Sequence, residues 1–375
     1  MPESGLQTGT KRWKRERRLA VIELSKVEAQ EVVGLDLGDR SSQICRLDRH
    51  TGVILEERRL STTTASVQRY FAARAPQLIA LESGTHSLWM TRLLKSLGHE
   101  VIVANPSKVR AISASQTKTD ERDARFLAQL ARVDPQLLSP VHPRSEESQQ
   151  AIAVVRAREG LVKARTMLIN QVRGVVKSFG FRLPAGSSAS FATKFQRATT
   201  LPVLLKATLE TLVRVIDELS QEIARSDKEV EALARRWTVT QRLRQIKGVG
   251  ALTALVFVLT LGDPLRFVHS RSVGAYLGLV PGSRSSGQST PQMPITKQGD
   301  RMLRRRLVQA SHYLMGPFGQ DSDLRRFGLR LAERGGKSGK KRAVVAVARK
   351  LAVLLHRLWV SETDYEPLRG AAAAA

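Results

Sequence analysis

Four carboxylates could act together in this chain, in which acidic residues are scarce. They are Asp36, Glu82, Asp120 and Asp123, and the chain holds 34 Asp and Glu against 61 Lys and Arg. The first two each end an apolar run, VVGLD and LIALE, that predicts a strand. The other two lie three apart in KTDERDARFLAQLA, which reads as a helix, so they share one helix face. Two strand ends and one helix face can bring four carboxylates to one point.

Such a cluster indicates a site for a hard metal ion. Carboxylates packed together repel one another unless cations neutralise them. Mg²⁺ is the expected ion and Mn²⁺ is possible chemically, because both take oxygen ligands, and two ions could hold the attacking and leaving oxygens of a phosphodiester. The spacing also fits a solvated helix face with an ordinary strand end at Asp36. Asp39 and Asp48 are spare candidates near the first strand.

The charge of the chain indicates a nucleic-acid partner. Its net charge is +27, spread along the sequence, with a pI near 11.1. An anionic membrane surface is the competing partner, but no apolar run is long enough to span a membrane and the basic start is not a secretory signal. The single cysteine, Cys45, excludes an intrachain disulfide and a Cys-based zinc site. We therefore expect a cytoplasmic protein of a bacterial or archaeal cell, associated with the nucleoid.

The chain divides by composition into five stretches. Residues 1–30 are a basic lead-in that we expect to be poorly ordered, and 361–375 are a tail. Residues 31–145 predict an α/β domain with β-β-β-α-β-α-β-α order and a mixed sheet, which fits a RuvC-like or ribonuclease-H-like fold. Residues 146–240 predict a long α-helical coiled-coil insert. Residues 241–360 predict a mostly α C-terminal domain.

The coiled-coil prediction rests on apolar steps of four and three residues. The first predicted helix carries them at Val154, Arg158, Leu161, Arg165, Leu168, Val172, Val175 and Phe179. The second carries them at Leu205, Leu209, Leu212, Ile216, Leu219, Ile223, Ser226, Val230 and Leu233. The two helices could pair within one chain or across a dimer.

A helix-hairpin-helix-like element is predicted in LRQIKGVGALTALVFVL, residues 243–259. Its GVG turn would free backbone N–H groups to bind phosphate, with Lys247, Gly248 and Gly250 as the contacts. The alternative is a glycine-rich turn between two packed helices.

The segment 277–311 joins a serine-rich loop, PGSRSSGQ, to a basic helix. Serines in such loops are usually turn formers. The helix after Gly299 puts its apolar residues on one face, namely Leu303, Leu307, Ala310 and Leu314. Candidate nucleic-acid contacts are Lys297, Arg301, Arg304 and Arg305. A solvated basic face explains the arginines equally well.

Taken in order, the motifs resemble one family over about residues 31–360. GLDLG (34–38), ALESG (80–84), NPSKVRA (105–111) and KTDERDA (118–124) match its N-terminal half, and IKGVG (246–250), YLGLVPGSRSSG (276–287), ITKQGDRMLRRRL (295–307) and VAVARKLAVLLHRLW (345–359) match its C-terminal half. The family is that of DEDD-type insertion-sequence transposases with a C-terminal serine domain. Some of its members are guided by a structured bridge RNA.

The resemblance implies a DNA recombinase with a serine nucleophile. The family's metal-binding acids fall on Asp36, Glu82, Asp120 and Asp123, and its serine falls on Ser286, with Ser285 as the alternative because the serine is doubled. It further implies a phosphoserine-linked DNA end, double-stranded DNA as substrate and a bridge RNA as partner. The chain has no Walker-type loop, as expected if the linkage keeps the energy of the phosphodiester.

A composite active site follows from the chain's length between the acids and the serine. Two long predicted helices separate Asp123 from Ser286, and the second, from Leu205 to Leu233, would span roughly 43 Å. We therefore expect a homo-oligomer, a dimer or tetramer, in which one chain supplies acids and another supplies serine. Two other functions stay open: a metal-dependent nuclease or Holliday-junction resolvase that uses water, and a nucleic-acid-binding protein without activity.

Overall fold

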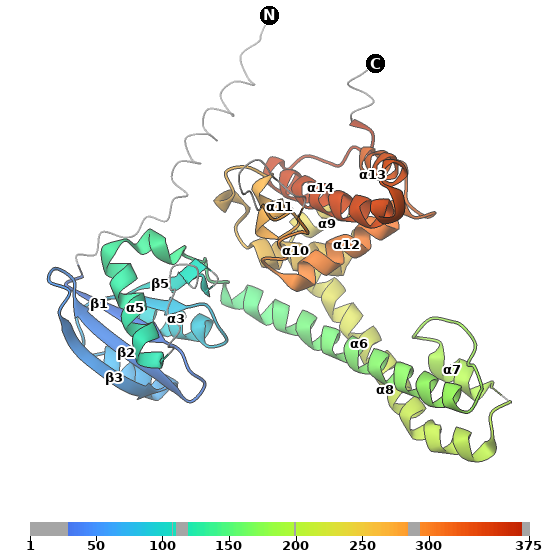
Figure 1. Cartoon of the computed structure of the whole chain (residues 1–375), viewed down its shortest axis with the longest axis horizontal. Helices are drawn as coiled ribbons and strands as arrows, with labels where there is room; N and C mark the ends of the chain where they lie inside the picture. The colour runs from blue at the N-terminus through green and yellow to red at the C-terminus, as the bar shows by residue number, and fades with distance from the viewer. Residues whose placement is uncertain (1–28, 107, 110–118, 199, 284–292, 370–375) are drawn as a thin grey trace, which may run out of the picture. The chain divides into compact units, whose positions relative to one another are not determined.

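The computed structural model describes residues 29–106, 108–109, 119–198, 200–283 and 293–369. The chain forms two compact units, and the division falls between Arg144 and Ser145 (Figure 1). Most of the predicted lead-in, both candidate nucleophiles Ser285 and Ser286, and the last six residues lie outside the described residues. No helix in the described part of the chain combines the length and the apolar character that crossing a membrane requires.

The first unit is a five-stranded mixed sheet covered by helices. Its elements are β1 (Glu31–Asp36), β2 (Ser41–Asp48), β3 (Ile54–Ser61), α2 (Thr64–Phe71), β4 (Leu78–Glu82), α3 (Ser87–Ser96), β5 (Glu100–Ala104) and α5 (Asp120–Val133). The strand order is β3-β2-β1-β4-β5. β1 runs antiparallel to β2 and parallel to β4, and β4 is parallel to β5. The predicted α/β domain with a mixed sheet is confirmed.

Alternation along the strands divides the core of this unit into two layers. Val33 and Leu35 of β1 pack with α2 and α3 on one face of the sheet. Val32 packs on the other face with residues of α5 such as Leu127. Successive side chains of a strand point to opposite faces, so a strand covered on both sides is apolar throughout. This explains the unbroken apolar run VVGL before Asp36.

The second unit begins with a helical hairpin. It contains α6 (Glu146–Ser178) and α8 (Val203–Arg236), with the short α7 (Phe191–Gln196) between them (Figure 1). Later residues of α6 meet earlier residues of α8: Arg158 Nε lies 2.6 Å from Asp227 Oδ1, and Arg165 donates to Ser220 Oγ at 3.2 Å. The two long helices therefore pair antiparallel within one chain.

The contact face of α6 includes most of the predicted positions together with the residues next to them. Arg158 and Arg165 contact α8, and Leu168 and Val175 pack against the small core at the far end of the hairpin. The fully buried residues also include Val155, Glu159, Ile169 and Val176, each one position further along the chain than a predicted residue. Only Val172 of the predicted set is buried. The N-terminal half of α6 also packs into the core of the C-terminal helices through Ile152 and Val155, so the helix has two contact partners.

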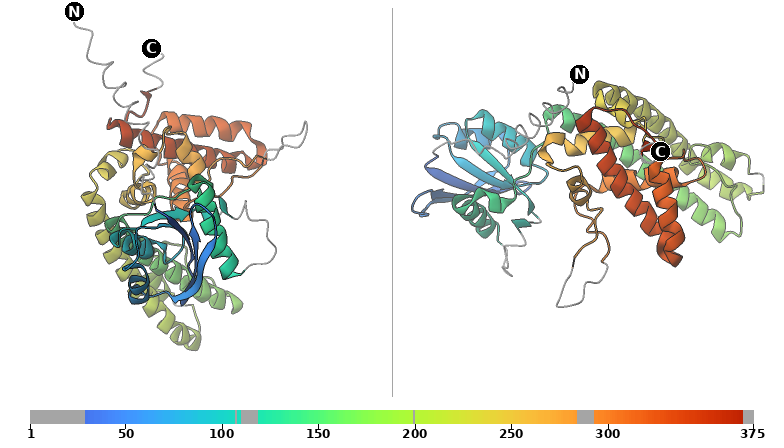
Figure 2. Two further views of the ribbon diagram at one scale, coloured as in Figure 1. Left: turned by 90° about the vertical axis from the view of Figure 1, so that its left-hand side faces the viewer. Right: turned by 90° about the horizontal axis from the view of Figure 1, so that it is seen from above.

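The remaining helices form one core around an almost wholly buried helix. They are α9 (Val239–Leu243), α10 (Ala251–Leu261), α11 (Ser272–Tyr276), α12 (Arg301–Met315), α13 (Asp323–Arg334) and α14 (Gly339–Ser361) (Figure 2). Every residue of α10 from Thr253 to Leu261 is buried. The predicted apolar face of α12 is confirmed, because Leu303, Leu307, Ala310 and Leu314 are all buried in this core.

Candidate functional site

Asp36 and Glu82 lie side by side at one edge of the sheet. β1 and β4 are parallel neighbours whose last paired residues are Leu35 and Leu81, and each carboxylate is the next residue of its strand. Both side chains are half-buried. The carboxyl ends of parallel strands meet at one edge, so the pairing brings these two acids together.

The first turn of α5 lies at the same edge. Gly34 of β1 faces the backbone of Ala124, near the start of α5, whereas Arg132, near its end, reaches the carbonyl oxygens of Arg49 and His50 beyond the other end of the sheet. The helix therefore runs antiparallel to β1, and its N-terminal turn lies beside the strand's carboxyl end. Thr119 caps that turn by accepting from the Arg122 N–H at 3.3 Å.

Asp120 and Asp123 belong to this N-terminal turn. The side chain of Asp120 is exposed and that of Asp123 is half-buried. Negative charge is favourable at a helix N-terminus because the free N–H groups carry partial positive charge. The fold thus brings all four predicted acids to one edge of the first unit, which we call the acid edge.

The loops that follow β1 and β4 are joined at the acid edge. His86 Nε2 lies 3.5 Å from Asp39 Oδ1, and the Trp89 indole N–H donates to His86 Nδ1 at 3.1 Å. In a neutral imidazole this leaves the ring proton on Nε2, facing the carboxylate. Sequence reasoning missed His86. Its signal was a position four residues after Glu82, in the loop opposite the spare candidate Asp39.

The other spare candidate, Asp48, lies away from the acid edge. It ends β2, which runs antiparallel to β1, and is therefore opposite Glu31, at the beginning of β1. Its carboxylate accepts from the N–H groups of His50 and Thr51 and forms the turn into β3. These bonds lower the pKa of Asp48 and explain the residue by turn chemistry alone.

The donor chemistry of the four acids fits a hard divalent cation, because each offers carboxylate oxygens. Within the part of the chain that the structure describes, however, no three His, Cys, Asp or Glu side chains gather closely enough to hold a metal ion. The acids share an edge without forming a closed coordination sphere by themselves. Any ion bound there needs further ligands, such as water or phosphate oxygens.

The arms of the serine-rich loop are held together by the backbone. Pro281 pairs with Ile295 in an isolated bridge, Gly282 donates to Pro294 O at 2.9 Å and Thr296 donates to Val280 O at 2.9 Å. Lys297, an exposed predicted contact, follows these arms with the unusual φ of 56°. These backbone contacts hold the two ends of the loop together, just before Ser283 and just after Met293.

The predicted GVG turn is exposed at two of its three candidate contacts. Lys247 and Gly250 are exposed, and Gly250 caps the start of α10. Gly248 has a φ of 100°, and an added Cβ would lie 2.9 Å from Tyr313 Cδ1. Gly248 is therefore explained by backbone conformation and packing. The phosphate-binding role of the turn stays a prediction.

The predicted arginines of α12 differ in how they are used within the chain. Arg301 is exposed. Arg304 donates to the carbonyl oxygens of Leu277 at 3.0 Å and Gln298 at 2.6 Å, and so ties together the two arms beside the serine-rich loop. Its burial lowers the pKa of the guanidinium. Arg304 thus has a structural task that the sequence did not reveal.

Arg305 and Arg306 both bind one buried acid of the hairpin. Both guanidinium groups donate to the carboxylate of Glu159, which is 7% exposed and belongs to α6. Burial lowers the pKa of Arg306, and the charge of Glu159 opposes this shift. The three side chains join α6 to α12. Sequence reasoning missed Glu159, whose signal is an acid among the apolar residues of a helix.

Two family models match this chain, one in each half. The family models described as "Transposase" (DEDD_Tnp_IS110) and "Transposase IS116/IS110/IS902 family" match residues 33–180 and 240–323. A "Probable family 20 transposase" of Pseudomonas aeruginosa is 31% identical over 89% of this chain and 98% of its own length. The chain belongs to the IS116/IS110/IS902 transposase family.

Two further relatives are also transposases of insertion sequences by name. The "Transposase for insertion sequence element IS1328" of Yersinia enterocolitica is 31% identical over 76% of this chain and 84% of its own length. The "Transposase for insertion sequence element IS1111A" of Coxiella burnetii is 27% identical over 94% of this chain and 96% of its own length. The first family match spans the acid edge and α6, and the second spans α9 to α12 with the serine-rich loop.

Proposed function

We propose that this chain is the transposase of an insertion sequence, which cuts and rejoins DNA through a covalent link to Ser286. The observation that carries the proposal is the acid edge: β1, β4 and the first turn of α5 bring four acids together in a chain of this transposase family. Its charge of +27 suits a polyanionic substrate.

The acids of the edge are proposed to hold divalent metal, Mg²⁺ or Mn²⁺. Asp36, Glu82, Asp120 and Asp123 supply carboxylate oxygens, and the phosphate of the DNA completes the set of ligands. When bound, the metal neutralises the charge that develops on the scissile phosphate. The carboxylates also keep the edge unfavourable for phosphate in the absence of cations.

The chemical step is a transesterification. The Oγ of Ser286 forms a bond to phosphorus, and the bond between phosphorus and the 3′-oxygen of the neighbouring nucleotide breaks. The serine hydroxyl proton leaves to solvent, and the departing 3′-oxygen takes up a proton. One phosphodiester replaces another, so rejoining by a 3′-hydroxyl needs no external energy source.

Trapping a covalent adduct tests the serine step. The protein is incubated with labelled DNA carrying an element end and Mg²⁺, and denatured samples are examined for label attached to protein. Ser286→Ala should abolish the adduct, whereas Ser283→Ala in the same loop should keep it. Ser285→Ala decides between the doubled serines. Cleavage that persists without an adduct in every variant would instead indicate a nuclease or junction resolvase that uses water.

A matched acid tests the assignment of the carboxylates. Glu121 lies between Asp120 and Asp123 in the same exposed turn, so Glu121→Gln controls for the loss of charge. Asp36→Asn, Glu82→Gln, Asp120→Asn and Asp123→Asn should each reduce adduct formation by at least a hundredfold. Chelation of divalent ions should do the same, and Mn²⁺ should restore activity. Equal activity of Asp123→Asn and Glu121→Gln would remove Asp123 from the site.

A composite site and a bridge RNA are proposed as the setting of the reaction. Mixing an Asp36→Ala protein with a Ser286→Ala protein should restore adduct formation if acids and serine come from different chains of a homo-oligomer. The RNA is tested by adding transcripts of the non-coding DNA that flanks the element. Adducts that form equally with and without these transcripts would remove the RNA from the proposal.

A further inference from the structure

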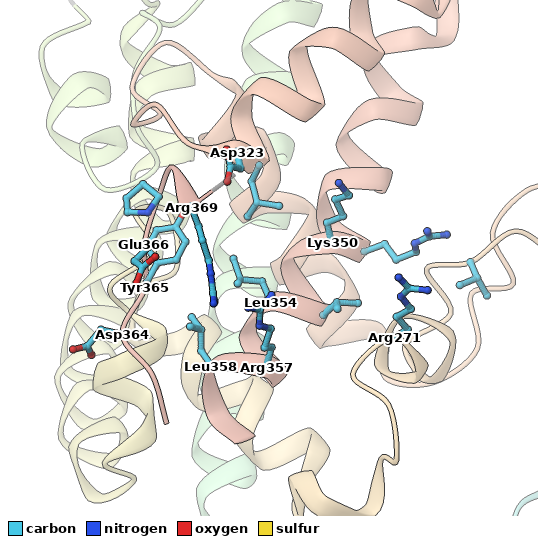
Figure 3. A pocket seen from close by; sticks show the side chains of 15 residues that line it. Arg271, Asp323, Lys350, Leu354, Arg357, Leu358, Asp364, Tyr365, Glu366 and Arg369 are labelled. Atoms are coloured by element: carbon cyan, nitrogen blue, oxygen red, sulfur yellow. The ribbon is translucent and has the colours of Figure 1, made fainter. Parts of the chain in front are cut away.

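A hollow of about 870 Å³ lies beside α14, the last helix of the second unit (Figure 3). Its walls are one face of α14, the start of α13, the chain segment that follows α14, and residues beside α11. We call it the α14 hollow. It lies within one unit of the chain, and its described lining includes none of the predicted acids or DNA-binding residues.

The rim of the α14 hollow is positively charged. Five basic residues line it against three acidic ones, and Figure 3 labels Arg271, Lys350, Arg357 and Arg369 among them. The basic residues are Arg271, Arg349, Lys350, Arg357 and Arg369. Within the described ranges, no carboxylate forms an ion pair with any of the four arginines. Their charge is thus available to an anionic ligand.

Two of the three acids of the rim are stabilised within the chain, and the third, Glu366, is exposed. Asp364 accepts from the side-chain amide of Gln245 at 2.8 Å. Asp323 stands in the first turn of α13, where the helix N-terminus stabilises negative charge. Among the basic residues, Lys350 is held to one side, since its Nζ lies 3.6 Å from the centre of the Phe327 ring. The four arginines outnumber the three acids, so the lining is positive even without Lys350.

The floor of the α14 hollow is apolar. Val353 and Leu354, both half-buried, lie on α14 between Arg349 and Arg357. The two arginines are eight residues apart, which places their attachment points about 12 Å apart along the helix. Residues at steps of four share a helix face, so an arginine stands at each end of an apolar strip.

We propose that the α14 hollow binds single-stranded DNA, with phosphates at Arg349 and Arg357 and bases on the apolar strip. A duplex keeps its bases stacked inside and would offer the strip only phosphates and sugars. A small anion would use the arginines and leave the strip without a partner. A single strand offers negative charge and apolar faces together, which is the combination present here.

The hollow reaches the base of the serine-rich loop. Val280 lines the hollow, and its carbonyl oxygen accepts from Thr296 N at 2.9 Å, which closes the arms of that loop. A strand held in the hollow therefore passes the point where the chain leaves toward Ser286. The inference rests on the proposed function in this respect, since DNA cut by the enzyme is the source of single strands.

Binding of a labelled oligonucleotide tests the inference without requiring cleavage. The probe is fluorescein-labelled oligothymidine, with a duplex and an oligouridine of the same length for comparison, and fluorescence anisotropy reports binding to the full chain. The double variant Arg349→Gln, Arg357→Gln should weaken oligothymidine binding at least tenfold. It should also lower the slope of log affinity against log salt by about 1.4, which is about 0.7 for each lost phosphate contact.

A matched double variant controls for charge. Arg330 and Arg334 are exposed on α13, four residues apart and outside the hollow, so Arg330→Gln, Arg334→Gln should change oligothymidine binding less than twofold. Val353→Asp, which places a carboxylate on the strip, should also weaken binding if its thermal unfolding is unchanged. Wild-type affinity in the Arg349, Arg357 variant would overturn the inference. An equal loss for the duplex, or a loss for oligouridine alone, would overturn the choice of single-stranded DNA.

The two proposals fail separately. Ser286→Ala protein should bind oligothymidine like the wild type, because the proposed contacts are the side chains of Arg349 and Arg357 and the apolar strip between them. If adducts form normally but the Arg349→Gln, Arg357→Gln variant binds oligothymidine as tightly as the wild type, only the proposed binding role of the α14 hollow is refuted. If no adduct forms but oligothymidine binding depends on Arg349 and Arg357, only the serine mechanism is refuted.

Discussion

Gly34 of β1 lies directly against Ala124 of α5. An added Cβ at Gly34 would lie 1.9 Å from the Ala124 carbonyl oxygen and 2.6 Å from the Ala128 nitrogen. No side chain fits at this distance, so only glycine lets the helix backbone approach the strand. The contact fixes α5 over β1 two residues before Asp36, and Ala124 follows Asp123. The acid edge therefore depends on a residue that carries no functional group.

Replacing Gly34 by alanine should destabilise the first unit. The obstructing atoms are backbone, so the helix must move, and overpacking of this kind costs about 1–3 kcal/mol. Urea denaturation should show a lower midpoint for Gly34→Ala. Gly84→Ala is the matched control, because an added Cβ there meets nothing within 4 Å. Equal midpoints for the two variants would mean that α5 does not hold this position.

Cys45 should be inert in the folded protein. It is wholly buried, and burial raises the pKa of its thiol to about 11, with a further contribution from Glu57. At pH 8 the thiol is therefore both inaccessible and protonated. Ellman's reagent should detect no thiol in the native protein and one after denaturation. Rapid reaction of the native protein would contradict the buried position of β2.

The first unit should lose stability as the solution becomes acidic. His99 is 4% exposed, its Nδ1 accepts from Gln77 N at 3.2 Å, and its Nε2 lies 3.2 Å from Phe71 O. Burial lowers the pKa of His99 in the folded state, so the unfolded chain binds the proton more readily. Stability is then fully present above the unfolded pKa of about 6.5 and is lost as pH falls through the folded pKa.

Urea denaturation between pH 7.5 and 5 measures this dependence. The midpoint for the first unit should fall with pH in the wild type, and the fall should be smaller in His99→Gln, which keeps hydrogen-bonding groups but does not titrate. The same slope in both proteins would assign the effect to another group.

Glu159 should be needed for the stability of the second unit. Its carboxylate binds Arg305 and Arg306, and Arg306 is only 14% exposed at its side chain. Removing one partner of a buried ion pair leaves an uncompensated charge and costs about 3–5 kcal/mol. Thermal unfolding of Glu159→Ala should show this loss. Glu229→Ala, an exposed acid on α8, should unfold like the wild type.

Local patterns in the sequence predicted the helices and strands, but they did not predict which elements pack against one another. The strands of the first unit and the apolar face of α12 follow from periodicity, because each needs only its own residues. The face of α6 is broader than the predicted stripe, since the helix packs against both α8 and the C-terminal core. Periodicity along one helix cannot weigh two partners against each other.

The candidate site shows the same division. Apolar runs that end in Asp36 and Glu82 predicted two strand ends, and the parallel pairing of β1 and β4 placed them together. His86 and Asp39 are 47 positions apart, and Glu159 and Arg306 are 147 positions apart. A local sequence pattern cannot predict contacts between residues so far apart. Single arginines are equally ambiguous: Arg304 reads as a DNA contact and is bound to backbone carbonyls.

The antiparallel path of α6 and α8 has a consequence for how this chain can change in length. The hairpin leaves the C-terminal core along α6 and returns to it along α8, with its own small core around α7 at the far end. Equal numbers of helical turns can therefore be removed from both helices while the chain re-enters the core at the same place. The length of the hairpin can therefore vary without any change in the helices from α9 to α14.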